Sequence, residues 1–193
     1  MALIPFTPEW RAARERKRRA GAYVAAVRQE PDEQDVRWLA DAAANGDLDH
    51  ARWELRYARW ALAALTAQRD ALDDSTGSEV YAELRSALLA DSRIDPNMLA
   101  LAEQQLGDRL SGYREAISSR GGSAGSGEKL GRVLLAFASD GARSAGAPLP
   151  RAVTLLSEYV AEANVALRAA YGVAMLPEHL PPSEARGRGA GRA

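Results

Sequence analysis

Apolar residues recur every seven positions between residues 48 and 72, and this is the strongest periodic pattern in the chain. The positions are Leu48, Ala51, Leu55, Ala58, Leu62, Leu65 and Leu72, with Arg69 as the exception. A second apolar stripe on the same segment consists of Trp53, Tyr57, Trp60, Ala64 and Ala71. A helix that is apolar on two sides is typically packed between neighbours. We therefore place this helix at the centre of the fold.

Three further long segments show the same alternation of three- and four-residue spacings. With the central helix they predict long helices near residues 8–29, 47–73, 96–119 and 150–171. Shorter helices connect them, and one of these is expected to begin at Thr76, where Thr76 and Glu79 match a capping box. No alternating run of β-branched residues predicts a sheet. The predicted fold class is an all-α, multi-helix bundle whose helices cross at about 20°.

Glycine, serine and proline divide this bundle and mark its end. Residues 119–127 and 140–149 predict two flexible loops inside a single helical domain that covers 1–176. The remaining segment, 177–193, is rich in proline, glycine and arginine and is predicted to be disordered.

The composition excludes several classes of functional site but does not identify one. The chain contains no cysteine, which excludes disulfides, thiolate metal sites and a cysteine nucleophile. The net charge is −1, so no overall positive field attracts nucleic acid. The first residues, 1–8, contain no apolar signal-peptide core, and no apolar stretch is long enough to span a membrane. We expect a cytoplasmic protein that has no membrane partner, and the arginine- and alanine-rich composition is typical of a GC-rich bacterial genome.

His50 and Glu54 form the first candidate site. Their spacing of four residues places both side chains on one face of the central helix. Carboxylates and histidines on facing helices bind iron or manganese in helical bundles, but such sites need two Glu-x-x-His pairs and further glutamates. The second histidine, His179, lies in the predicted tail. A metal site at His50 and Glu54 is therefore incomplete, and a solvated or core-edge pair is the simpler interpretation.

A basic stretch on the first helix forms the second candidate. It consists of Arg11, Arg14, Arg16, Lys17, Arg18 and Arg19. Clustered cations can follow a nucleic-acid backbone or contact a protein partner. The acidic segment 32–49 follows in the sequence and is expected to neutralise the cluster, within one chain or across a dimer. A solvated face or a protein contact is favoured over nucleic acid.

Aromatic residues concentrate in the first third of the chain. All four tryptophans, Trp10, Trp38, Trp53 and Trp60, precede residue 61, and Tyr57 lies among them. Such residues fill cores by default, but they also anchor interfaces or line pockets.

No complete catalytic set emerges from these residues. The leading hypothesis is a non-enzymatic interaction or assembly protein that self-associates through its seven-residue repeats and needs no cofactor. The alternatives are a metal-binding bundle enzyme that uses His50 and Glu54, and a nucleic-acid-binding protein that uses the first helix.

Overall fold

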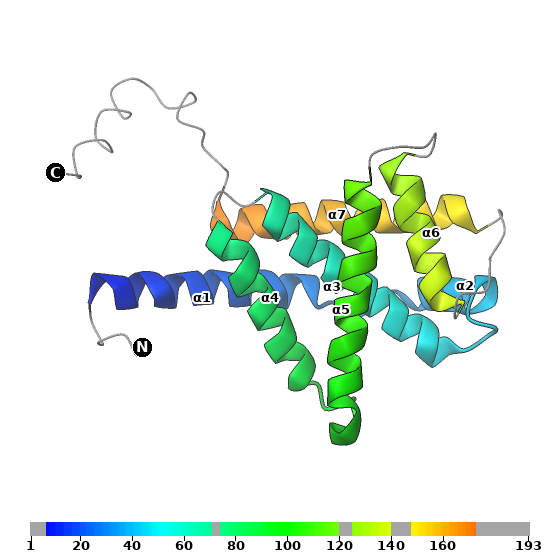
Figure 1. The fold of residues 1–193 in the computed structure, drawn as a ribbon, viewed down its shortest axis with the longest axis horizontal. Helices are drawn as coiled ribbons and strands as arrows, with labels where there is room; N and C mark the ends of the chain where they lie inside the picture. Colours follow the sequence, from blue (N-terminus) through cyan, green and yellow to red (C-terminus); the bar gives the residue numbers. More distant parts are fainter. Residues whose placement is uncertain (1–6, 71–73, 120–124, 140–147, 173–193) are drawn as a thin grey trace.

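The computed structural model of the chain describes residues 7–70, 74–119, 125–139 and 148–172 (Figure 1). Within these ranges every regular element is helical. The elements are α1 (Pro8–Val27), α2 (Glu33–Ala42), α3 (Leu48–Asp70), α4 (Asp74–Leu89), the 3₁₀ helix η1 (Pro96–Met98), α5 (Leu99–Ser118), α6 (Ser126–Ala138) and α7 (Leu149–Tyr171). The predicted all-α, multi-helix bundle and its four long helices are confirmed.

The helix ends follow from local sequence in most cases. The Thr7 hydroxyl accepts a hydrogen bond from the Trp10 N–H and caps α1, with Pro8 in the first turn. Asn45 and Gly46 adopt positive φ values of 52° and 83° and end the α2 segment. The capping box predicted at Thr76 is wrong, because α4 begins at Asp74 and Thr76 lies buried inside the helix. Thr76 is therefore not the N-cap residue of α4.

The central position of α3 is confirmed, since α3 contacts every other α-helix. Its seven-residue stripe from Ala51 to Leu65 belongs to one hydrophobic cluster, together with residues of α2, α5, α6 and α7. Its second stripe, represented by Tyr57 and Trp60, belongs to another cluster with α1, α4, α5 and the end of α7. One helix thus supplies both cores, which explains why it is apolar on two sides. Leu48 is the exception and remains 47% exposed.

The helices do not all run at a shallow angle to one another, and this differs from the predicted crossing of about 20°. Figure 1 shows α1 and α7 running antiparallel, with α4, α5 and α6 crossing that direction steeply. Glycines permit two of the close approaches. A Cβ at Gly131 would lie 3.0 Å from the Leu149 Cδ1 atom of α7, and a Cβ at Gly112 would lie 3.0 Å from the Phe137 ring of α6. The close approach of α6 to α7 and of α5 to α6 therefore depends on a glycine at each contact, and not on heptad packing.

Several predictions fall partly or wholly outside the described residues. The segment 177–193 lies outside them, as do Leu72, Ala71 and most of the two predicted loops. The end of the first predicted loop is helical, because α6 begins at Ser126. Among the described helices, none has a stretch long and apolar enough to cross a membrane.

Candidate functional site

A surface groove of about 390 Å³ lies between the first half of α3 and the segment that leads from η1 into α5. It brings together four of the predicted site residues: His50, Trp53, Glu54 and Tyr57. The other lining residues are Asp47, Asp49, Arg93, Ile94, Asp95, Met98, Leu101, Ala102 and Gln105. We call this the acidic groove.

Two helix starts form the wall of the acidic groove. The Asp47 carboxylate accepts hydrogen bonds from the Asp49 and His50 amides at 3.0 and 2.9 Å, which caps α3. The Asp95 carboxylate accepts one from the Asn97 amide at 2.8 Å, and Pro96 follows as the first residue of η1. Local capping preferences thus bring two acidic side chains to the same surface.

Glu54 forms a buried ion pair with Arg109 of α5. The Glu54 Oε2 atom lies 3.1 Å from Arg109 Nε, and Oε1 lies 2.5 Å from Nη2. The Glu54 and Arg109 side chains are 3% and 11% exposed. The guanidinium also lies 5.6 Å from the Tyr57 ring centre and 4.5 Å from that of Phe137. Both carboxylate oxygens are occupied by the guanidinium, so the pair joins α3 to α5.

His50 has no comparable partner. Its Nε2 atom is buried and makes no hydrogen bond to the described residues. In the part of the chain that the structure describes, no group of three or more histidine, aspartate or glutamate side chains could hold a metal ion. The geometry therefore adds no support to the hypothesis of a metal at His50 and Glu54, because Arg109 already binds both oxygens of the Glu54 carboxylate.

Trp53 and Tyr57 form the aromatic part of the acidic groove, with ring centres 5.6 Å apart. The Arg56 guanidinium lies 4.7 Å from the Trp53 ring centre. The Tyr57 hydroxyl donates to the Gln105 side-chain oxygen at 3.1 Å. Burial raises the pKa of Tyr57 to about 12, so the hydroxyl stays protonated as a donor at neutral pH.

The structure does not gather the predicted aromatic residues into one pocket. Trp60 is buried in the core, 2% exposed, as the default interpretation expects. Trp10 is half-buried on α1, and Trp38 is half-buried on α2 beneath the Arg151 guanidinium. Only Trp53 and Tyr57 share a site.

The most exposed apolar residues of the acidic groove are two that sequence patterns did not single out. Met98 and Leu101 are 48% and 42% exposed. Both lie off the buried stripe of α5, which contains Ala102, Leu106 and Tyr113. Their offset from this stripe can be read from the sequence, and it indicates a surface contact, because an apolar residue away from the core-facing stripe has no partner inside the fold.

The carboxylates at the rim of the acidic groove have no cationic partner among the described residues. No ion pair joins Asp47, Asp49 or Asp95 to any described lysine or arginine. The one arginine in the lining, Arg93, is bound by Glu30 and Asp91. The acidic groove therefore presents negative charge around exposed apolar side chains.

The basic stretch of α1 is partly neutralised, although by different residues than the sequence suggested. Arg16 pairs with Glu79 of α4 at 2.8 Å, and Lys17 lies 3.8 Å from Glu83. Arg18 and Arg19 both pair with Glu15 on the same helix. Their hydrogen bonds lower the pKa of Glu15 to about 2.

The acidic segment 32–49 does not neutralise this basic stretch within the chain. Glu33 pairs with Arg52, and Asp35 pairs with Arg151. The expectation of neutralisation by this segment within one chain is thus corrected, because α1 packs mainly against α4 and α7.

Comparison with protein-family models, curated proteins and solved structures finds no significant match to this chain.

Proposed function

We propose that this chain is a non-enzymatic assembly protein that binds a second copy of itself. In this proposal, the first half of α1 of one copy lies in the acidic groove of another. The observation that carries the proposal is the chemistry of that groove, in which two exposed apolar side chains, Met98 and Leu101, stand among aspartates that no described cation neutralises. Such a surface favours an amphipathic, basic helix as its occupant.

The first half of α1 has the complementary properties. No residue of α1 before Ala20 is buried, so this part of the helix is not packed into either core. It carries six cations against Glu9 and Glu15. The two pairs with Glu79 and Glu83 leave an excess of positive charge. Opposite charges would steer the two surfaces together, and the apolar contacts would supply most of the affinity.

The seven-residue repeat is not the surface that this proposal uses. Ala51, Leu55 and Leu62 are almost completely buried within one chain. An interface built on them would require the bundle to open. Self-association is therefore assigned to the acidic groove and α1.

Nucleic-acid binding by α1 is not proposed. At least four of the six cations in the basic stretch are already ion-paired, which reduces the positive charge available to phosphates. No described feature favours base contacts.

Sedimentation velocity over a micromolar concentration range tests the proposal. We expect a concentration-dependent dimer or larger species that weakens as salt is raised. Leu101→Asp should raise the dissociation constant at least about tenfold, because it places a charge in an apolar contact. Val165→Asp on α7 is the matched control, since Val165 is 68% exposed and lies outside the acidic groove.

A charge exchange identifies the two surfaces. Asp49→Lys and Arg14→Glu should each weaken association several-fold, and the two variants mixed together should regain it. A strict monomer at micromolar concentration would overturn the proposal. So would association that Leu101→Asp leaves unchanged.

A further inference from the structure

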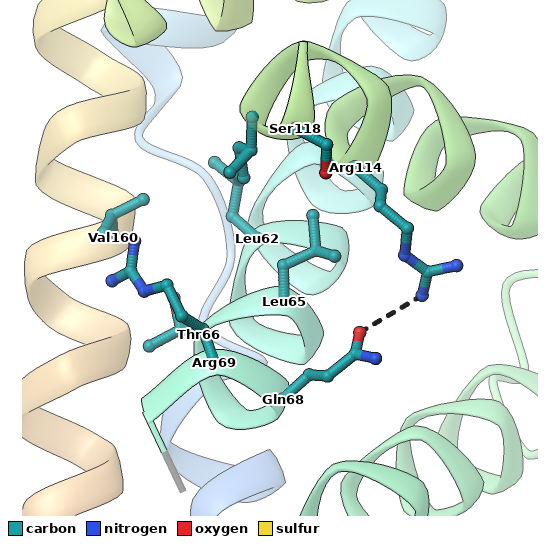
Figure 2. A pocket seen from close by; sticks show the side chains of 9 residues that line it. Leu62, Leu65, Thr66, Gln68, Arg69, Arg114, Ser118 and Val160 are labelled. Carbon is teal, nitrogen blue, oxygen red and sulfur yellow. Dashed lines mark hydrogen bonds between the residues drawn. The ribbon is translucent and has the colours of Figure 1, made fainter. Parts of the chain in front are cut away.

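A second cavity, of about 280 Å³, lies near the C-terminal ends of α3 and α5 where they face α7 (Figure 2). Its floor is apolar and is formed by Leu62, Leu65, Ile117 and Val160. It shares no lining residue with the acidic groove, which lies at the opposite end of α3. We call it the arginine-flanked cavity.

Two guanidinium groups flank the apolar floor. Arg69 is bound by both carboxylate oxygens of Asp70, each at 2.7 Å. Arg114 donates to the side-chain oxygen of Gln68 at 3.3 Å, the bond drawn as a dashed line in Figure 2. No described carboxylate lies within ion-pair distance of Arg114. The cavity therefore has a positive charge at its edge that the described residues do not neutralise.

We propose that the arginine-flanked cavity binds a small monocarboxylate with an apolar tail. The carboxylate would replace the Gln68 oxygen as the acceptor of the Arg114 N–H groups. A long hydrogen bond to a neutral amide is weak, whereas a guanidinium and a carboxylate form a two-pronged, charge-assisted pair. The tail would lie on Leu62, Leu65 and Val160, away from water.

The size and charge of the cavity restrict the ligand further. At about 30 Å³ for each water-sized group, its volume corresponds to roughly nine or ten non-hydrogen atoms, which is one carboxylate group on a tail of about six or seven carbons. The C-terminal ends of α3 and α5 carry partial negative charge, which opposes a dianion such as phosphate. The apolar floor would also leave phosphate oxygens without donors. One carboxylate on a short aliphatic chain fits both restrictions.

Titration of the full chain with octanoate, followed by calorimetry and by methyl NMR, tests this proposal. We expect one bound octanoate per chain, with the largest shifts at the methyl groups of Leu62, Leu65, Ile117 and Val160. Arg114→Gln should raise the dissociation constant about tenfold or more, in line with the loss of one charge-assisted hydrogen-bonded pair. Arg132→Gln is the matched control, because Arg132 is an exposed arginine on α6 outside the cavity.

A second variant and two ligand controls keep the result decisive. Ile117→Asp changes a residue that is 38% exposed and should repel the carboxylate with little effect on folding, which circular dichroism checks. Acetate lacks the tail and octanol lacks the charge, so each should bind at least about tenfold more weakly than octanoate. No octanoate binding at millimolar concentration would overturn the proposal. Equal binding of octanol, or equal binding by Arg114→Gln, would overturn the role assigned to the carboxylate. None of these outcomes would bear on the self-association that is proposed for the acidic groove and α1.

Discussion

The Glu54–Arg109 pair shows how a candidate reactive group can serve the fold. Both side chains are almost completely buried, and two aromatic rings flank the guanidinium. A buried charge is costly to leave without its partner, although the complete pair adds little beyond what apolar residues would supply. The sequence placed Glu54 beside His50 on one helix face, but it held no sign that Arg109, 55 residues later, would occupy the carboxylate.

We expect Glu54→Leu to lower the free energy of unfolding by about 3–5 kcal/mol, because it leaves the Arg109 charge buried and unpaired. The double variant Glu54→Leu, Arg109→Met should recover most of that loss. Urea denaturation measures both. The exposed pair of Arg85 and Glu103 is the comparison, since Arg85→Gln should cost less than about 1 kcal/mol. Equal losses from the single and double variants would contradict this account of the pair.

Among the elements, the contact between α6 and α7 depends most visibly on a missing side chain. A Cβ at Gly131 would lie 3.0 Å from Leu149 Cδ1 and 3.1 Å from Val153 Cγ2. Helix periodicity predicts that position as part of an apolar helix, but periodicity gives no information on how closely the next helix approaches. Periodicity also gives no information on the angle between helices, so the steep crossings in Figure 1 differ from the predicted angle of about 20°.

Gly131→Val should destabilise the protein by about 1–3 kcal/mol, because the added methyl groups force α6 and α7 apart. Gly107→Ala in α5 is the matched control. Apart from its chain neighbours and the backbone of its own helix, no atom lies within 4 Å of a Cβ at Gly107, so alanine there should stabilise the helix by about 0.5–1 kcal/mol. Thermal and urea denaturation measure both changes. A loss of stability on Gly107→Ala would show that the two positions are not distinguished by packing.

Across the whole molecule, an ion network joins segments that are distant in sequence. Glu30, which follows α1, binds Arg56 of α3 and Arg93, and Arg93 also binds Asp91 after α4. Burial opposes ionisation of Glu30, but the hydrogen bonds from Arg93 and Arg56 outweigh it and lower its pKa. The bonds from Arg93 likewise lower the pKa of Asp91, which is buried. The network therefore ties the α1–α2 and α4–η1 connections to the central helix.

Because this network lowers the pKa of Glu30 and Asp91, the free energy of unfolding should fall as the pH is lowered. A carboxylate whose pKa is lower in the folded chain than in the unfolded chain stabilises the fold at pH values above its unfolded pKa of about 4. That contribution is lost as the pH falls through its folded pKa. We expect the urea midpoint to fall between pH 5 and 3. That fall should be shallower in Arg93→Met than in the unmodified chain. Arg37→Met, on the exposed face of α2, should leave the slope unchanged, and parallel slopes for all three proteins would refute the role of Arg93.

The amino-acid sequence by itself determined the helical class, the four long helices and the double-sided character of α3. These are local properties, set by spacing, capping and proline, and each is decided within a few turns of one helix. The tertiary structure decided which groups meet: Arg109 with Glu54, Glu79 and Glu83 with the basic helix, Met98 with the aspartates of the acidic groove. Such meetings depend on helix crossing and on long-range packing, which no periodicity within one helix encodes. From the sequence, His50 and Glu54 were one candidate, and Trp53 and Tyr57 belonged to a separate set of aromatic residues. Only the packing of the helices places these four side chains in one groove and decides its charge balance and its exposed apolar contacts.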